Sequence, residues 1–347
     1  MGVKLGGLVE ARKFAIPDLA GRKVAMDGHN ILYQFLAIIR SRQGEPLRDR
    51  EGRVTSHLSG LIYRNSNLME AGLKVAYVFD GTPHQFKRKV VRARAQVRRE
   101  AKARYEEAVK EGRVEEARRY AQRAATVGTD IVADAKRLLT LMGVPWVQAP
   151  GEGEAQSSYM ARRGDVWGSA SQDFDSLLYG TPVLLRNLSI TGRRKLPRKN
   201  VYIRVEPEMI ELGRFLRELG LTREQLIDVG ILVGTDYNPD GIKGVGPKTA
   251  LKLIRKHGSL EGAIPHLKNA EFPHPVEEIR ALFQSPRVTD EFELEWRPPD
   301  REGVVGFLCG ERDFDRGRVL KAVEKVSRGF LRGRERTTLD QWFRPGS

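Results

Sequence analysis

The sequence predicts an α/β fold: a mostly parallel central sheet flanked by helices, with a helical region after it. Two features of the 347-residue chain support this prediction. Over the first half, short apolar runs alternate with helical patterns, which is the order expected of parallel strands joined by helical crossovers. After about residue 200 the pattern becomes mainly helical.

The expected strands are short apolar runs, and the two clearest ones end at an aspartate. Residues 22–26 lead to Asp27, and residues 74–79 lead to Asp80. Weaker strand patterns lie at residues 144–147 and 165–170. The first of these weaker runs contains a proline, which restricts it to the edge or the start of a strand.

The expected helices have apolar residues at every third or fourth position. They cover residues 31–39, 129–141, 208–218, 222–233, 247–256 and 313–328. Pro247 favours a helix start and Gly258 favours a helix end. Residues 264–300 are rich in proline, and we expect loops there.

Residues 87–125 form a helical pattern of a different kind. Alanine, arginine, lysine and glutamate dominate this stretch, and Gly112 is its one glycine, with no proline. This composition favours helices but offers little apolar surface for burial in a core. We therefore expect helices that project into solvent or contact a charged partner.

The chain is basic, and its basic residues are concentrated. It has 60 Lys+Arg against 45 Asp+Glu, a formal net charge of +15. Residues 87–123, 191–204 and 312–336 carry +8, +6 and +5, which leaves −4 for the remaining chain. This separation indicates a polyanionic partner and a distinct acidic site. On charge alone, solvated basic helices remain the alternative.

Several classes of protein and site are excluded. The one cysteine, Cys309, rules out a disulfide scaffold and a cysteine-rich zinc module. The six histidines form no H-x-x-x-H pair, so any metal is expected to bind mainly to oxygen. No apolar run approaches the roughly 20 residues of a membrane span, and no signal-peptide pattern is present. We expect a cytoplasmic protein.

Acidic residues gather at positions that suit a metal site. Besides the two strand-end aspartates, pairs occur in GEGEA and SQDFDS, and a single acid follows an apolar run in ILVGTDY. These further acids are Glu152, Glu154, Asp173, Asp175 and Asp236. Ligands bind beyond the carboxyl ends of parallel strands. Any one of these acids alone could equally be a helix cap or a turn residue. Carboxylates that converge repel one another unless hard cations such as Mg²⁺ or Mn²⁺ neutralise them.

A glycine-containing loop predicts a contact with the DNA backbone. Gly244 and Gly246 precede the helix that begins at Pro247, and they would let backbone N–H groups approach a phosphate. Lys243 and Lys248 add positive charge. With the helical pattern before it, the segment resembles a helix–hairpin–helix that binds DNA without reading its sequence. The alternative is an ordinary connection between two helices.

Five motifs in order closely resemble those of the flap endonucleases within the XPG nuclease family. They read MDGHNILYQF, AYVFDGTP, APGEGEAQ, SQDFDSLLYG and LVGTDYNPDGIKGVGPKTA. The similarity extends from about residue 1 to residue 343 and is greatest to the flap endonuclease 1 type, with an archaeal member favoured. It implies a PIN-like nuclease core that cleaves DNA 5′ flaps at the junction of single strand and duplex, in replication (Okazaki fragment maturation) and repair.

The resemblance assigns a role to each acid. It implies that two Mg²⁺ ions, which Mn²⁺ can replace, bind to acids that are at once catalytic and metal-ligating. These acids are Asp27, Asp80, Glu152, Glu154, Asp173, Asp175 and Asp236. It further implies a K⁺ ion at the helix–hairpin–helix.

The resemblance also implies DNA contacts. Lys87 and Arg94 match basic residues at the base of a helical arch, where they would contact the scissile phosphate. Tyr33 matches an aromatic residue that stacks on a base, with packing in the core as its alternative. Arg40 is a weaker candidate, equally consistent with a solvated arginine at a helix end. The full DNA-binding set is Tyr33, Arg40, Lys87, Arg94, Lys243, Gly244, Gly246 and Lys248, with the basic segment 191–204 as a further duplex contact.

The end of the chain resembles a motif that binds the sliding clamp PCNA. Leu339, Trp342 and Phe343 fit its apolar and aromatic positions, whereas Arg336 stands where the family has glutamine. We therefore expect clamp binding without the glutamine contact.

The expected organisation is a single nuclease domain, residues 1–335, followed by a clamp-binding tail, residues 336–347. The domain divides into an N-terminal part, the arch, an internal part, the helix–hairpin–helix and a C-terminal helical part: residues 1–86, 87–129, 130–235, 236–258 and 259–335. We expect a monomer that binds branched DNA and no membrane. The alternatives are a 5′–3′ duplex exonuclease of the same fold and a non-catalytic DNA-binding scaffold.

Overall fold

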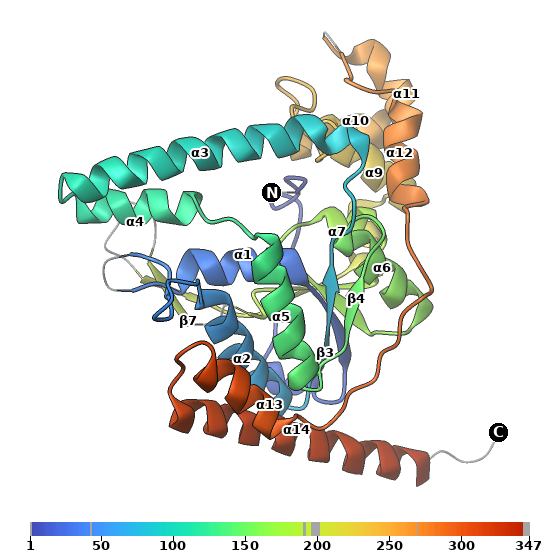
Figure 1. Cartoon of the computed structure of the whole chain (residues 1–347). Helices are drawn as coiled ribbons and strands as arrows, with labels where there is room; N and C mark the ends of the chain where they lie inside the picture. Colours follow the sequence, from blue (N-terminus) through green and yellow to red (C-terminus); the bar gives the residue numbers. More distant parts are fainter. Residues whose placement is uncertain (1, 42–43, 190–191, 196–201, 269, 343–347) are drawn as a thin grey trace.

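The computed structural model describes residues 2–41, 44–189, 192–195, 202–268 and 270–342, and a seven-stranded sheet lies at its centre (Figure 1). The strand order is β1-β9-β6-β5-β2-β3-β4. The strands are β1 (Arg12–Lys13), β2 (Lys23–Asp27), β3 (Lys74–Phe79), β4 (Trp146–Gln148), β5 (Gly168–Ala170), β6 (Val183–Arg186) and β9 (Glu208–Glu211). The five strands from β6 to β4 are parallel, and β9 and β1 add antiparallel pairings at one edge. The predicted fold class is confirmed.

Helices bury both faces of the sheet, as parallel sheets require. Val24 and Met26 of β2 point into one apolar cluster, while Ala25 between them points into another. The first cluster includes α1 (Gly28–Ile38), α2 (Ser56–Glu70), α5 (Thr129–Leu141), α13 (Arg301–Val305) and α14 (Arg316–Trp342). On the opposite face, α6 (Gly153–Arg163) packs on β2, β3 and β4.

A helical region extends the second face beyond the sheet. Its helices are α7 (Asp175–Leu178), α8 (Leu212–Leu219), α9 (Arg223–Val233), α10 (Pro247–His257), α11 (Leu260–Ala263) and α12 (Val276–Gln284). They share an apolar cluster of their own, built around the buried side chains of Leu226, Ile227 and Phe283. The loop between α9 and α10 is the predicted hairpin.

Two helices form an arm that projects from the rest of the molecule (Figure 1). They are α3 (Arg88–Lys110) and α4 (Val114–Arg123), joined by a turn in which Gly112 has a φ of 70°. The two helices pack on each other through small side chains, because Ala101 and Ala108 of α3 and Ala117 and Ala121 of α4 are buried. We call α3, α4 and their turn the arch.

Three expectations about secondary structure were wrong or incomplete. Residues 208–211 form strand β9 instead of the start of a helix, because Glu208–Glu211 pairs with β6 at the sheet edge. Within the expected loops, α12 forms because Val276, Ile279 and Phe283 share one buried helix face. Finally, α14 continues to Trp342, well past residue 328, so the predicted boundary at residue 336 falls inside one helix.

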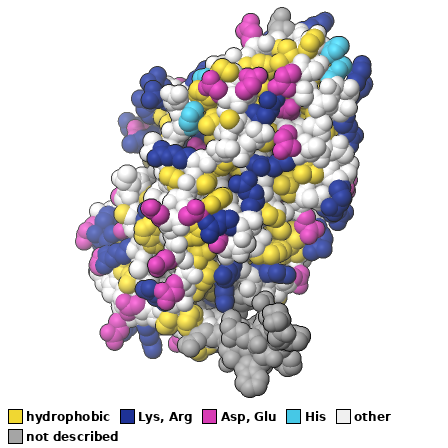
Figure 2. All heavy atoms as spheres, turned by 90° about the vertical axis from the view of Figure 1, so that its right-hand side faces the viewer, with side chains coloured by type: hydrophobic (Ala, Val, Ile, Leu, Met, Phe, Trp, Pro, Cys, Tyr) yellow, Lys and Arg dark blue, Asp and Glu magenta, His cyan; other side chains and the backbone are white. Residues whose placement is uncertain are grey.

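The remaining elements are short. They are the hairpin strands β7 (Gly192–Lys195) and β8 (Tyr202–Val205), and single turns η1 (Ile16–Leu19), η2 (Gln85–Lys87), η3 (Ile264–His266) and η4 (Gly306–Gly310). Residues 285–300 contain no helix or strand and run along the molecule from α12 to α13 (Figure 1). The face with α6 and α12 mixes basic, acidic and apolar side chains (Figure 2), so the basic surplus is not gathered there. Among the described helices, none is long and apolar enough to cross a membrane.

Close packing of α14 on α2 predicts that two glycines of α14 respond differently to alanine. A Cβ at Gly329 would lie 2.1 Å from the carbonyl oxygen of Met69, so Gly329→Ala should lower the free energy of unfolding by about 1–3 kcal/mol. A Cβ at Gly333 would meet only the flexible end of Lys74, at 3.3 Å. Gly333→Ala should therefore be neutral or stabilise by up to about 1 kcal/mol. Denaturant unfolding measures both, and equal effects would contradict the packing.

Candidate active site

The seven predicted acids come from different elements but gather at the carboxyl edge of the parallel strands. Asp27 ends β2, and Asp80 directly follows β3. Glu152 and Glu154 lie at the start of α6, and Asp175 is the first residue of α7. Asp173 lies just before α7, and Asp236 follows α9. The parallel register of β2 and β3 explains why the first two acids are neighbours.

Ser171 connects acids from two elements. Its Oγ lies 3.1 Å from Asp27 Oδ2 and 2.7 Å from Glu154 Oε1. Ser176 Oγ donates to the same Glu154 oxygen at 3.1 Å. The carboxylates of β2 and α6 are thus held around one hydroxyl, beyond the end of β5.

Burial and mutual repulsion make several of these acids hard to ionise. Burial raises the pKa of Asp27 to about 8, and the charges of Asp80 and Asp173 contribute in the same direction. Burial and the charge of Asp236 raise the pKa of Asp175 to about 7. The pKa of Glu154 is raised well above its ordinary value by burial and by Asp175 and Asp27. Each of these shifts disfavours the charged form of the carboxyl group, because neighbouring negative charges repel it.

Two basic residues of the arch base reach into this acidic cluster. Lys87 Nζ lies 2.6 Å from Glu152 Oε2 and 3.3 Å from Asp236 Oδ2. The Arg94 guanidinium lies 2.6 Å from Asp236 Oδ1. Burial alone would lower the pKa of Lys87, but the charges of Glu152, Tyr237 and Asp236 outweigh it and the pKa is raised. Because the side chains of Lys87, Glu152 and Asp236 are only 12–18% exposed, water screens these ion pairs weakly.

The chemistry of the cluster fits a hard divalent cation. Its seven acids offer only oxygen atoms, and among the described residues Glu152 Oε1 is buried without a hydrogen-bond partner. Among the described residues, no three His, Cys, Asp or Glu side chains are already arranged around one point to hold a metal ion. Oxygens of the cluster have protein partners instead: Asp80 Oδ1 accepts from Gly153 N and Asp175 Oδ1 from Val3 N, both at 2.7 Å.

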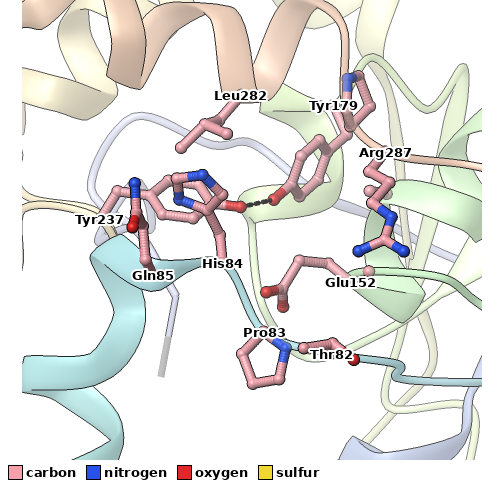
Figure 3. Close-up of a pocket in the computed structure, with 12 residues that line it drawn as sticks. Thr82, Pro83, His84, Gln85, Glu152, Tyr179, Tyr237, Leu282 and Arg287 are labelled. Carbon is pink, nitrogen blue, oxygen red and sulfur yellow. Dashed lines mark hydrogen bonds between the residues drawn. The ribbon is translucent and has the colours of Figure 1, made fainter.

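A cavity of about 280 Å³ borders the cluster (Figure 3). Its lining includes Glu152, whose carboxylate faces the cavity, and Arg287 from the segment after α12. The hydroxyls of Tyr179 and Tyr237, also in the lining, are hydrogen-bonded to each other at 2.7 Å. The acid cluster is therefore bordered by a cavity as well as by the base of the arch.

The two predicted DNA-contact residues on and after α1 lie in different surroundings. Tyr33 is 39% exposed, while its neighbours Leu32 and Phe35 are buried, so it is not part of the core stripe. The Arg40 guanidinium is half-buried, and it donates to the carbonyl oxygens of Ala37, Gly44 and Ala121 at 3.2, 3.0 and 2.7 Å. Arg40 thereby links the end of α1 to α4 of the arch.

The predicted hairpin starts next to Asp236 of the acid cluster, and its glycine-containing end is exposed. Gly244 has a φ of 84°, and Gly246 caps the N-terminus of α10. A Cβ at either glycine would meet nothing within 4 Å, so both backbones are open to a ligand. Lys243 and Lys248 flank them and are exposed.

The predicted clamp-binding residues lie at the end of the last helix and just after it. Leu339 and Trp342 belong to α14, and Arg336 lies on the same helix. Phe343 lies outside the described residues.

Several residues that contact the acids were not predicted from the sequence. His29 Nδ1 accepts a hydrogen bond from the backbone N–H of Asp80 at 3.0 Å, and Asn30 donates to Asp173 at 3.2 Å. His29, Asn30 and Ser171 lie within three residues of a predicted acid in the sequence motifs, and this proximity could have identified them. Val3, which donates to Asp175, has no such signal in the sequence.

Comparison with known proteins gives one consistent result. Residues 1–101 match the XPG N-terminal domain and residues 143–236 match the XPG I-region. The chain is 50% identical to "Flap endonuclease 1" of Pyrococcus horikoshii, over 99% of this chain and 98% of the relative. It is 52% identical to "Flap endonuclease 1" of Hyperthermus butylicus, over 99% and 100%. The solved structure of flap endonuclease-1 from Methanococcus jannaschii matches with a TM-score of 0.75 and 41% identity, over 95% and 99% of the two chains.

The raised pKa of Asp27 predicts how stability depends on pH in the presence of a chelator. The unfolded carboxyl loses its proton near pH 3.8, whereas the folded one holds it to about pH 8. Folding therefore binds a proton in this window, and stability falls as the pH rises from about 4 to 8. Asp27→Asn removes the charge and keeps the oxygen that caps Asn30 N. At pH 8 it should raise the free energy of unfolding by at least about 2 kcal/mol, with a smaller gain at pH 5.

Urea unfolding at the two pH values measures this difference. The matched control is Asp240→Asn, because that carboxylate is exposed and should change little. Other titrating groups, such as the buried His57, are present in both the parent and the variant, so their contributions cancel in the difference in unfolding free energy. A loss of stability at pH 8, or a gain that is larger at pH 5, would contradict the assignment.

Proposed function

The chain belongs to the flap endonuclease 1 family, and on that premise we propose that it is a structure-specific nuclease that cleaves 5′ flaps in DNA replication and repair. The observation that carries the proposal is the acid cluster at the sheet edge with two cations of the arch base inside it. A scaffold protein would gain nothing from buried carboxylates that raise one another's pKa.

A divalent metal ion is the cofactor that this family and this donor set indicate. We propose Mg²⁺, two ions per site, with Mn²⁺ able to replace it. The ligands would be the seven acids Asp27, Asp80, Glu152, Glu154, Asp173, Asp175 and Asp236. Bound divalent ions supply a water of lowered pKa and neutralise charge on the phosphodiester.

The chain's own residues then bind and orient the DNA strand. Lys87 and Arg94 lie where a phosphate entering the cluster would meet them, and their charge would stabilise the additional negative charge of the transition state. Exposed Tyr33 offers a face on which a base can stack. The arch, with its basic and apolar-poor surface, is the proposed passage for the single-stranded flap.

Duplex DNA is held, in this proposal, by the hairpin after α9. The open backbone at Gly244 and Gly246 and the N-terminus of α10 suit a phosphate, and Lys243 and Lys248 add charge. A K⁺ ion at this hairpin and a duplex contact by the basic segment 191–204 belong to the same proposal.

The remaining proposals concern partners and setting. The tail residues Leu339, Trp342 and Phe343 would bind the sliding clamp, more weakly than in relatives with glutamine at the position of Arg336. We propose a monomer that acts in the cytoplasm, with residues 1–335 as its nuclease domain.

Cleavage of four end-labelled substrates tests the function. The substrates are a 5′ flap, a 3′ flap, a nicked duplex and a blunt duplex, each with Mg²⁺ or with chelator. The proposal expects metal-dependent cleavage of the 5′ flap near its junction. Preference for the blunt or nicked duplex would favour a 5′–3′ exonuclease, and binding without cleavage would favour a scaffold.

The ion pairs of Lys87 predict a kinetic signature. Lys87→Ala should lower single-turnover cleavage by about 100-fold or more while flap affinity changes little, because this cation acts mainly on the charge of the transition state. The matched control is Lys89→Ala, two residues along the arch, since Lys89 is exposed and forms an ion pair with exposed Asp240 at 3.6 Å, outside the acid cluster. If both variants lost affinity equally and kept their rates, Lys87 would be a binding contact alone.

A further inference from the structure

We propose that Asn30 and Gln34 are positioning residues that orient Asp173 for metal binding through a one-way chain of hydrogen bonds. The chain starts at Ser189, passes through Gln34 and Asn30, and ends on Asp173. The inference rests on the proposed role of Asp173 as a metal ligand. None of the three donors is itself a candidate ligand.

The contacts run along one face of α1 and beyond it. Asn30 Nδ2 donates to Asp173 Oδ2 at 3.2 Å, and Gln34 Nε2 donates to Asn30 Oδ1. Ser189 Oγ donates to Gln34 Oε1 at 3.1 Å. Asn30 and Gln34 are four residues apart, so they are neighbours on the helix surface. Ser189, in the segment after β6, is buried.

Every hydrogen bond in this series runs in the same direction, toward Asp173. Asn30 turns its NH₂ group toward the accepting carboxyl oxygen of Asp173 and its own oxygen toward Gln34. Gln34 must then present its own NH₂ group to Asn30, which leaves its oxygen for the Ser189 hydroxyl. All three dipoles point the same way, and aligned hydrogen bonds polarise and strengthen one another.

Asn30 also connects two of the acids. Its backbone N–H donates to Asp27 Oδ1 at 3.0 Å, while its side chain holds Asp173. One residue at the start of α1 therefore contacts two carboxylates: that of Asp27, which ends β2, and that of Asp173, which follows β5. Groups that orient the ligands of a metal commonly change its affinity by about 10–100-fold when they are removed.

Calorimetric titration of Mn²⁺ into the DNA-free full chain tests the proposal. Asn30→Leu should weaken Mn²⁺ binding by about tenfold, and Gln34→Leu by a smaller factor. Because both act through one chain, the double variant should bind Mn²⁺ as weakly as Asn30→Leu alone. Ser189→Ala is the mildest change, and its Mn²⁺ affinity should lie between those of the parent and Gln34→Leu. It keeps the proposal testable if a leucine variant fails to fold.

A buried amide elsewhere provides the matched control. Asn65 is fully buried and accepts a hydrogen bond from Tyr77 at 2.8 Å, away from the acids. Asn65→Leu should lower the thermal midpoint and leave Mn²⁺ affinity unchanged. The proposed hydrogen-bond series would be overturned if Asn30→Leu bound Mn²⁺ as tightly as the parent. It would also be overturned if the losses of Mn²⁺ affinity in the two single variants added up in the double variant. Absence of Mn²⁺ binding in the parent itself would instead overturn the proposed metal site.

Discussion

Like charges buried at the carboxyl edge of the sheet are the constraint on which the site depends. Parallel strands bring the ends of β2 and β3 together, and the starts of α6 and α7 add further carboxylates. Burial and repulsion raise the pKa of Asp27, Glu154 and Asp175, so positive charge near these groups is stabilising. In the described structure Lys87 and Arg94 provide part of it.

The arch is tied to the site by the same interaction. Lys87 and Arg94 lie at its base, so the side chains that offset the acids are also those proposed to meet the phosphate. Arg40 fixes the other end of the arm by bonding the carbonyl of Ala121 in α4. Charged side chains thus contact the arch at both ends, which suits an element proposed to accommodate a charged strand.

Much of the fold and of the acid set could be predicted because their signals are local. The strand ending at Asp27 and helix α5 follow from apolar periodicity. Strand β9 could not be predicted, because its pairing with β6 across the sheet edge overrides a helical pattern. The roles of Ser171, Asn30 and Arg40 depend on contacts between residues 81–144 positions apart, which no local pattern encodes.

Protons and metal ions are alternative ways of neutralising the buried acids, and proton release on metal binding tests this directly. Mn²⁺ is titrated into the chain at pH 7 in two buffers that differ in ionisation enthalpy. The pKa values of Asp27 and Asp175 are about 8 and 7, so at pH 7 both carboxyl groups hold much of their protons. Mn²⁺ binding should therefore release about one proton or more per protein molecule. The release should be smaller at pH 9, where Asp27 and Asp175 have lost most of their protons. Saturable Mn²⁺ binding with no buffer dependence at pH 7 would contradict the account.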